Sequence, residues 1–221
     1  MTARVLVIAG GWTGHAPRRL ARLVSTALEA HGCDVTVETR LAAFDDARRL
    51  RDADLVVPLW TMGNLSWERS ENLRDAIAAG TGLGGVHGSG DAFRSATEYQ
   101  FVLGGQFVAH PGGDQTDYEV EIAQPGHPIT RGLGAFRVRS EQYYLHVDPS
   151  IDVLATTAFP TADESSTFAM PVAWTRTFGA GRVFYCSLGH TPAVVADGPA
   201  HALMVRGLLW AAGCEHALAA A

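Results

Sequence analysis

The stretch Thr-Gly-Leu-Gly-Gly-Val-His-Gly-Ser-Gly, residues 81–90, decides the fold, because an apolar strand runs directly into a glycine-rich turn with His87 at its apex. In α/β hydrolases an elbow of this kind between a strand and a helix lifts a serine nucleophile above the carboxyl ends of parallel strands. Here the apex residue is a histidine, which serves as a base, an acid or a metal ligand. The stretch therefore predicts a doubly wound α/β sheet with a histidine-based site at its carboxyl edge.

The residues before this stretch alternate between strand and helix patterns. Apolar runs predict strands, apolar residues at helical spacing predict helices, and Ser66 is expected to cap the second long helix. The expected order is strand 4–9, helix 16–31, strand 34–39, strand 53–58, helix 66–79 and strand 82–87. Successive βαβ units have right-handed crossovers, so these strands should lie parallel in a sheet that helices cover on both faces.

The second half of the chain has short strand patterns and few helices. Strands are expected at 117–123, 135–139, 151–157, 171–177 and 182–187, and a closing helix at 200–212. Gly179-Ala180-Gly181 is expected to form a hairpin turn between the last two strands. We therefore expect an antiparallel or mixed extension of the sheet within one domain spanning 1–221, with fraying beyond Gly213.

The composition of the chain limits the kinds of partner that the protein is expected to bind. A chain of 221 residues, 47% hydrophobic and 18% charged, fits one globular domain. The net charge of -6, with 17 Lys and Arg spread along the chain, disfavours nucleic acid and anionic membranes. No apolar run approaches the ~20 residues that cross a bilayer, and Met1–Ile8 is too short for a secretory signal, so we expect a cytoplasmic protein that binds a small molecule. The three cysteines form no Cys-x-x-Cys pair, which disfavours disulfides and a cysteine zinc site.

Histidines at turns and strand ends are the main candidates for chemistry. His15 ends Gly-Gly-Trp-Thr-Gly-His after the first strand, so its turn should lie on the same sheet edge as His87. His190 reaches that edge if the last strand is parallel to the first four. His110, which precedes Pro111, could equally be a buried turn histidine bonded to a carbonyl. The glycines around His15 match no nucleotide-binding fingerprint, so no nucleotide cofactor is expected.

One carboxylate and several aromatic residues complete the candidates. Glu141, in Ser-Glu-Gln-Tyr-Tyr, follows a strand beside aromatic residues, where burial would raise its pKa from about 4.3 toward the general-acid range. Its alternative is a surface salt bridge with Arg137 or Arg139. Asp91 could cap a helix or contact a substrate. Aromatic rings that could stack on a sugar, or instead pack in the core, belong to Trp12, Trp60, Tyr143 and Trp174.

Seven short motifs occur in order along the chain: Gly-Gly-x-x-Gly-His, Gly-Val-His-Gly, Gly-Gly-Gln-Phe-x-x-His-Pro, His-Pro-Ile-Thr-x-Gly-Leu, Ser-Glu-Gln-Tyr, Pro-Val-Ala-Trp and Gly-Arg-Val-Phe-Tyr-x-Ser-Leu-Gly-His. Together they resemble the ThuA-like (trehalose utilisation) family over residues ~4 to 212. The resemblance implies a class I glutamine amidotransferase-like fold: a flavodoxin-like three-layer sandwich with a mostly parallel central sheet and a β-rich extension in the second half. It also implies that His87 replaces the amidotransferase cysteine, so that glutaminase chemistry is disfavoured.

The resemblance further implies a role in the catabolism of trehalose and related disaccharides, with a functional link to a sugar dehydrogenase. The family's polar motifs fall on His15, His87, His110, Glu141, Tyr143 and His190. Two departures reduce the anionic ligands open to a metal. Ser140 stands where an acidic residue often precedes the glutamate, and Pro17 follows shortly after His15 where the family often has a further acidic or histidine group.

The leading hypothesis is an enzyme that acts on a sugar or keto-sugar by isomerisation or by hydrolytic or eliminative cleavage. His87 and Glu141 would form the acid/base pair, with His190 beside them. Alternatively, His15, His87 and His190 would surround a zinc, manganese or nickel ion. Substrate binding is assigned to His15, Trp12, His110, Tyr143 and Trp174.

Two other functional classes stay open at this point. One is a non-catalytic sugar-binding protein that uses Trp12, Tyr143 and Trp174 as a platform. The other is an amidotransferase-like partner subunit that has lost its glutaminase activity. Homo-oligomerisation is compatible with the fold size, and the residues specify neither the sugar nor the bond that changes.

Overall fold

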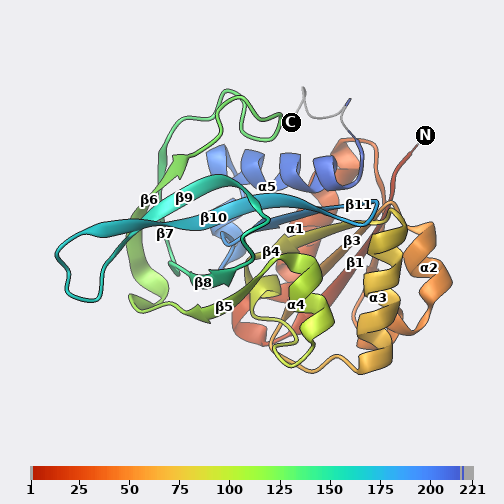
Figure 1. Cartoon of the computed structure of the whole chain (residues 1–221). Helices are drawn as coiled ribbons and strands as arrows, with labels where there is room; N and C mark the ends of the chain where they lie inside the picture. The colour runs from red at the N-terminus through yellow and green to blue at the C-terminus, as the bar shows by residue number, and fades with distance from the viewer. Residues whose placement is uncertain (1, 215, 217–221) are drawn as a thin grey trace.

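One large mixed sheet forms the centre of the computed structural model, which describes residues 2–214 and 216 (Figure 1). Its strand order is β2 (Asp34–Glu38), β1 (Arg4–Gly11), β3 (Leu55–Thr61), β4 (Gly82–Val86), β11 (Gly181–Cys186), β10 (Thr167–Phe178), β9 (Asp152–Pro160), β6 (Thr116–Ile122) and β7 (Phe136–Ser140). The strands from β2 to β11 in this order are parallel, and those from β10 to β7 are antiparallel. The predicted α/β class, with a parallel part and a β-rich extension, is confirmed.

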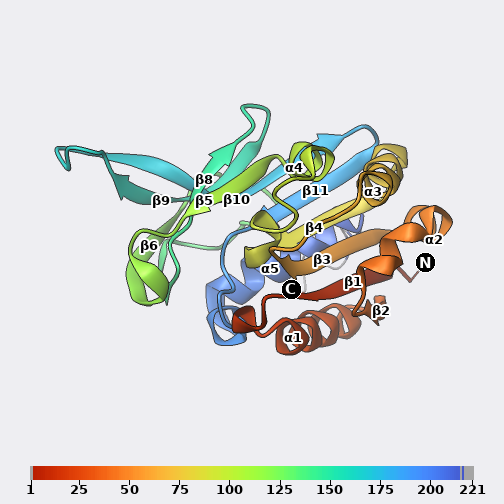
Figure 2. The same ribbon diagram turned by 90° about the horizontal axis from the view of Figure 1, so that it is seen from below.

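Helices cover both faces of the parallel strands (Figure 2). One face packs against α1 (Pro17–Ala30) and α5 (Gly198–Ala211), and the other against α2 (Ala47–Asp52), α3 (Trp67–Ala79) and α4 (Thr97–Leu103). Alternate residues of β1 show this directly, because Val5 and Val7 belong to one core while Leu6 and Ile8 belong to the other. A strand that is buried on both faces has a continuous apolar sequence, and this is why β1 could be predicted from the sequence.

Local signals explain where the elements begin and end. The hydroxyl of Ser66 accepts a hydrogen bond from the amide of Arg69, so the predicted cap of α3 is confirmed. Gly179 has a φ of +60° in the hairpin that pairs Phe178 with Gly181, as predicted. The fraying expected beyond Gly213 falls, apart from residues 214 and 216, outside the described residues.

A separate two-stranded sheet was not predicted from the sequence. It pairs β5 (Gly105–Ala109) with β8 (Tyr144–Val147) in antiparallel fashion. Both strands are short, and each lacks a regular alternation of apolar and polar residues, so the pattern did not reveal them. The pairing of Ala109 with Tyr144 places His110 next to the segment that carries Glu141.

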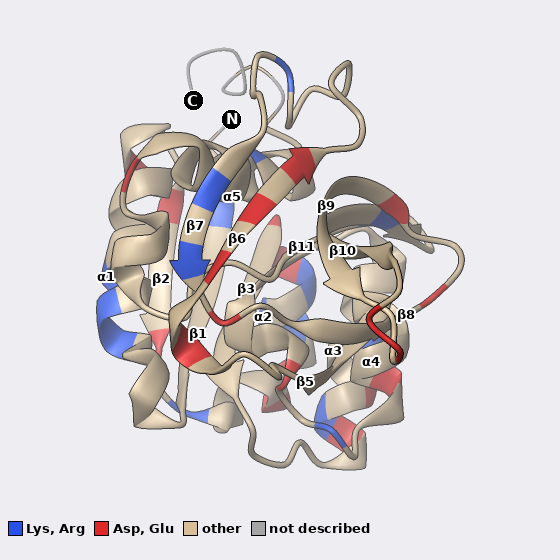
Figure 3. Ribbon diagram, turned by 90° about the vertical axis from the view of Figure 1, so that its left-hand side faces the viewer, with Lys and Arg blue, Asp and Glu red and all other residues tan. Residues whose placement is uncertain are grey.

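The outer strands explain the environment of two arginines. Arg137 and Arg139 of β7 lie opposite Glu119 and Asp117 of β6, and Figure 3 shows the basic and acidic bands side by side on these strands. Opposite charges at cross-strand positions favour this register. The alternative that paired Glu141 with these arginines is therefore wrong.

Trp174 lies in the core beneath β5. It does not reach the sheet edge that carries the histidines. Its side chain is 0% exposed, its indole N–H donates to the carbonyl of Leu103, and its ring lies 4.4 Å from that of Tyr185. The expectation that Trp174 contacts a sugar is therefore corrected. A large ring with its one polar atom satisfied is the usual state of a buried tryptophan.

Two further expectations concern cysteines and membranes. The three cysteines are free and buried. Among the described residues, no helix combines the length and the apolar composition that a bilayer crossing would require.

Replacing Trp174 with Phe should lower the free energy of unfolding by about 1–3 kcal/mol, because the carbonyl of Leu103 loses its donor and the ring leaves a void. Urea unfolding measures this. The matched control is Trp67→Phe, since Trp67 is 62% exposed and its replacement should stay within about 0.5 kcal/mol. Equal losses in the two variants would contradict the core assignment.

Candidate functional site

Three histidines and one glutamate meet at the carboxyl edge of the parallel strands. His15 follows β1, His87 follows β4, His190 follows β11 and Glu141 follows β7. One donor atom from each of the four lies within 4.8 Å of all the others. We call this group, His15, His87, Glu141 and His190, the histidine–glutamate cluster. The prediction that the turns of His15 and His87 share one edge is confirmed, as is the parallel orientation that brings His190 there.

The elbow at His87 is held in an unusual backbone conformation. His87 has a φ of +42°, a left-handed value that costs a non-glycine residue about 1–2 kcal/mol. The hydroxyl of Tyr185 donates to the carbonyl of His87, and the amide of Val86 donates to the hydroxyl of Ser89. Gly88 must lack a side chain, because a Cβ there would lie 2.1 Å from Oγ1 of Thr61. Backbone strain of this kind concentrates at functional sites.

The imidazole of His87 is oriented by a backbone carbonyl. Its Nδ1 lies 2.7 Å from the carbonyl oxygen of Ser187, which can only accept, so Nδ1 carries the proton. Nε2 therefore faces inward, 2.9 Å from the hydroxyl of Tyr143 and 3.1 Å from Oε2 of Glu141. Burial lowers the pKa of His87 to about 4, and the hydrogen bonds to Glu141 and Ser187 only partly offset this effect. Nε2 of His87 is thus the ring atom that faces the interior of the site.

Imidazoles surround both carboxylate oxygens of Glu141. Oε2 faces Nε2 of His87 and, at 3.7 Å, Nε2 of His15, while Oε1 lies 3.2 Å from Nδ1 of His190 and 3.7 Å from Nε2 of His110. Burial raises the pKa of Glu141, but hydrogen bonds from His15 and His87 and the charges of nearby histidines outweigh it, so the pKa lies well below its usual range. The expectation of a raised pKa is therefore wrong, and Glu141 is an ionised carboxylate.

The other predicted residues take different places around the cluster. Tyr143 is buried beneath His87, with their rings 4.3 Å apart. Trp12 is 45% exposed and meets the ring of His15 edge-on at 4.7 Å, and the side chain of His110 is 40% exposed. Trp12 and His110 therefore form the accessible rim of the site, and the deeper groups lie below them.

Several residues next to the cluster were missed by sequence reasoning. Oγ1 of Thr61 lies 2.8 Å from Nδ1 of His15, and Thr61 stands three residues beyond the predicted end of its strand. The carbonyl of Ser187 is a backbone group, which no side-chain pattern identifies. Asp91, already a candidate from the sequence, is buried and forms an ion pair with Arg94, which the sequence did not indicate and whose guanidinium lies 5.1 Å from the ring centre of Phe107. A search of the three residues that follow each predicted strand would have identified Thr61.

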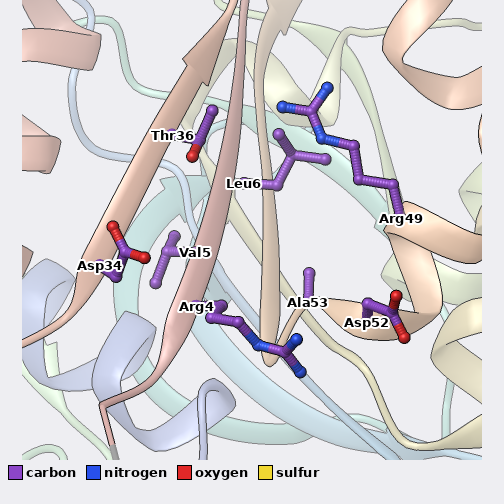
Figure 4. A pocket seen from close by; sticks show the side chains of 8 residues that line it. All are labelled: Arg4, Val5, Leu6, Asp34, Thr36, Arg49, Asp52 and Ala53. Atoms are coloured by element: carbon purple, nitrogen blue, oxygen red, sulfur yellow. The ribbon is translucent and has the colours of Figure 1, made fainter.

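A separate hollow lies at the opposite, amino edge of the sheet (Figure 4). Two of its arginines form ion pairs, Arg49 with Glu38 at 2.8 Å and Arg4 with Asp54 at 3.7 Å. The residues that line it are Arg4, Val5, Leu6, Asp34, Thr36, Arg49, Asp52 and Ala53. Ligands of doubly wound folds bind at the carboxyl ends of strands, so the histidine–glutamate cluster is the stronger candidate.

Solved structures with the same fold include ThuA-like proteins. One from Parabacteroides merdae ATCC 43184 has a TM-score of 0.75 and 20% identity, covering 96% of this chain and 90% of that chain. One from Bacteroides uniformis ATCC 8492 has a TM-score of 0.76 and 17% identity, covering 96% and 91%. A β-galactosidase from Bacillus circulans sp. alkalophilus has a TM-score of 0.62 and 14% identity, covering 97% of this chain and 31% of that chain. At these identities the likeness shows the fold alone.

Sequence comparison identifies the family. No curated protein sequence is significantly similar to the chain. A family model described as ThuA, trehalose utilisation, matches residues 4–211, which include every member of the histidine–glutamate cluster. Because this match spans nearly the whole sequence, the chain belongs to the ThuA family.

Proposed function

We propose that this protein is an enzyme of carbohydrate metabolism that moves a proton on a sugar or keto-sugar of the trehalose type. The family description supports a role in carbohydrate use. The observation that carries the proposal is the buried carboxylate of Glu141, whose two oxygens face imidazoles at the functional edge of the sheet. Burying a charge is costly unless it is paired and hydrogen-bonded, and perturbed groups of this kind gather at active sites.

The protonation states assign the proton-transfer roles. Glu141 is an anion and His87 is neutral, so both act as bases and Glu141 does not supply the proton as an acid. A base here takes a proton from a hydroxyl or from the carbon next to a carbonyl, and a neighbouring imidazole returns it to oxygen. Returning it to the carbonyl oxygen gives an enediol, which becomes the isomer when the neighbouring hydroxyl loses its proton and the former carbonyl carbon gains one. Returning it to a departing glycosidic oxygen gives eliminative cleavage, and attack by an activated water gives hydrolysis.

Recognition of the sugar is assigned to the rim. Trp12 presents an exposed indole beside His15, and flat aromatic faces stack on the apolar faces of sugar rings. His110 stands across Glu141 with an exposed imidazole that can bond a sugar hydroxyl. Tyr143 is buried and bonded to His87, so we assign it to positioning that ring. A dehydrogenase that supplies the keto-sugar, a cytoplasmic location and a homo-oligomer belong to the same proposal.

Glutaminase chemistry fits the site poorly. The apex of the elbow is the imidazole of His87, where an amidotransferase needs a thiolate. The nearest cysteine in the sheet, Cys186, is paired with Val86 in the register and is fully buried. Burial raises the pKa of its thiol to about 12, which keeps it protonated.

Glu141→Gln should reduce turnover of a keto-disaccharide by about 10²–10⁴-fold, because the amide cannot accept the transferred proton. NMR in D₂O, with trehalose and its keto derivatives as substrates, follows both product formation and hydrogen exchange beside the carbonyl. His146→Gln, at an exposed position of β8, is the control and should retain full activity. Binding of these sugars by the wild type without exchange or product would overturn the enzymatic proposal in favour of a sugar-binding protein.

Trp12→Ala should raise KM by about 2- to 10-fold and leave kcat almost unchanged, because it removes about 0.5–1.5 kcal/mol of ring contact away from the reacting atoms. Trp12→Phe keeps an aromatic face and should recover most of the affinity. Steady-state kinetics of the two variants tests this. A loss confined to kcat would remove Trp12 from substrate binding.

A further inference from the structure

We propose that His15, His87, His190 and Glu141 bind one divalent transition-metal ion, with Zn²⁺ the best match to three imidazoles and one carboxylate. The set combines ligands found in protein zinc sites. Manganese and nickel also accept nitrogen and oxygen donors, so the same set is compatible with them. The catalytic part of this inference rests on the proposed function. The binding part rests on the geometry of the cluster alone.

The spacing of the donor atoms suits a single ion. In a tetrahedral site with metal–ligand bonds of about 2.0–2.1 Å, neighbouring ligand atoms lie about 3.3 Å apart. The oxygens of Glu141 lie 3.1 Å from Nε2 of His87, 3.2 Å from Nδ1 of His190 and 3.7 Å from Nε2 of His15. The largest separation within the set is below 4.8 Å, so a small inward adjustment brings all four donors to one centre.

The hydrogen-bond pattern leaves a place for a cation. Nδ1 of His87 donates to the carbonyl of Ser187, so Nε2 faces the carboxylate of Glu141 at 3.1 Å and the hydroxyl of Tyr143 at 2.9 Å. Two acceptors at that distance repel each other unless a proton or a metal ion lies between them. A metal ion satisfies both acceptors at once and also neutralises the buried carboxylate.

Outer contacts hold two of the rings in the orientation that a metal needs. Nδ1 of His87 is bonded to the carbonyl of Ser187, and Nδ1 of His15 lies 2.8 Å from Oγ1 of Thr61. In both rings Nε2 is thereby turned toward Glu141. Metal-binding histidines characteristically bond a backbone carbonyl or a polar group through the second nitrogen, which fixes the tautomer and the ring angle.

His190 supplies an independent sign of an absent partner. The residue is only 9% exposed, and its Nδ1 makes no hydrogen bond with any part of the chain that the structure describes. That nitrogen nevertheless lies 3.2 Å from Oε1 of Glu141. A buried imidazole nitrogen without a hydrogen bond is costly, and coordination of a metal ion would remove the cost.

His110 lies outside the ligand set and would remain free to carry a proton. Its Nε2 is 3.7 Å from Oε1 of Glu141, and its side chain is 40% exposed at the rim. With the ion bound, His87 and Glu141 would be ligands and no longer bases, the metal would polarise a carbonyl or hydroxyl oxygen of the substrate, and His110 would take over the transfer of the proton.

Metal binding is tested on protein purified without a polyhistidine tag. Elemental mass spectrometry should find about one transition-metal ion per chain in the wild type. After chelation, titration with Zn²⁺ against a competing chelator gives the affinity, and Co²⁺ substitution gives visible d–d bands that report nitrogen and oxygen ligands. His15→Gln and Glu141→Gln should each weaken Zn²⁺ binding by about 100-fold or more, and Thr61→Val by about 10–100-fold.

His146→Gln is the matched histidine control and should bind Zn²⁺ like the wild type. Far-UV circular dichroism shows whether each variant is folded. If a ligand variant does not fold, Thr61→Val still tests the site, because it changes a residue that contacts a ligand and leaves the ligands themselves in place. The inference is overturned if the chelated wild type takes up neither Zn²⁺ nor Co²⁺, or if the ligand variants bind them as tightly as the control. Turnover of the keto-sugar without any metal would overturn the catalytic part of this inference alone, whereas tight binding of metal without turnover would leave the metal site standing and overturn the proposed function.

Discussion

The parallel pairing of β4 with β11 is the constraint on which the site depends. It sets Val86 opposite Cys186, so the residues that follow, His87 and Ser187, leave the sheet side by side. The carbonyl of Ser187 then holds Nδ1 of His87 and turns Nε2 toward the interior of the site. A shift of the register by one residue would remove this carbonyl from the ring, and the elbow would lose the contact that defines its chemistry.

Around this pair the protein places one buried carboxylate, Glu141, among imidazole rings. Glu141 comes from β7 at the far edge of the sheet, and it reaches the elbow because the antiparallel strands extend the sheet beyond β11. Desolvation alone would make Glu141 a neutral acid, but the donors that face it keep it ionised. The same burial keeps His87 neutral. The electrostatic character of the site is therefore a balance between desolvation and hydrogen bonding, and the hydrogen bonds decide the state of the carboxylate.

The β-rich second half of the chain therefore contributes residues to the site as well as to the core. The small sheet of β5 and β8 brings Nε2 of His110 to 3.7 Å from Oε1 of Glu141, while Tyr143 packs under His87 just before β8 begins. Trp174 fills the space between β10 and the end of α4, and its hydrogen bond to the carbonyl of Leu103 joins these two elements just before β5 begins. The rings of the second half are in this way divided between the core and the site.

The sequence by itself determined the α/β class, the parallel order of the first half and the meeting of His15, His87 and His190 at one edge, because apolar periodicity and glycine turns are local signals. Only the tertiary structure decided which side chains face each other and in which protonation state. The contacts that matter join residues far apart in the chain, with separations of 46 for His15 and Thr61, 54 for His87 and Glu141, and 100 for His87 and Ser187. Burial and hydrogen bonding between residues far apart in the sequence determine the pKa of Glu141 and place Trp174 in the core. No local sequence pattern carries that information.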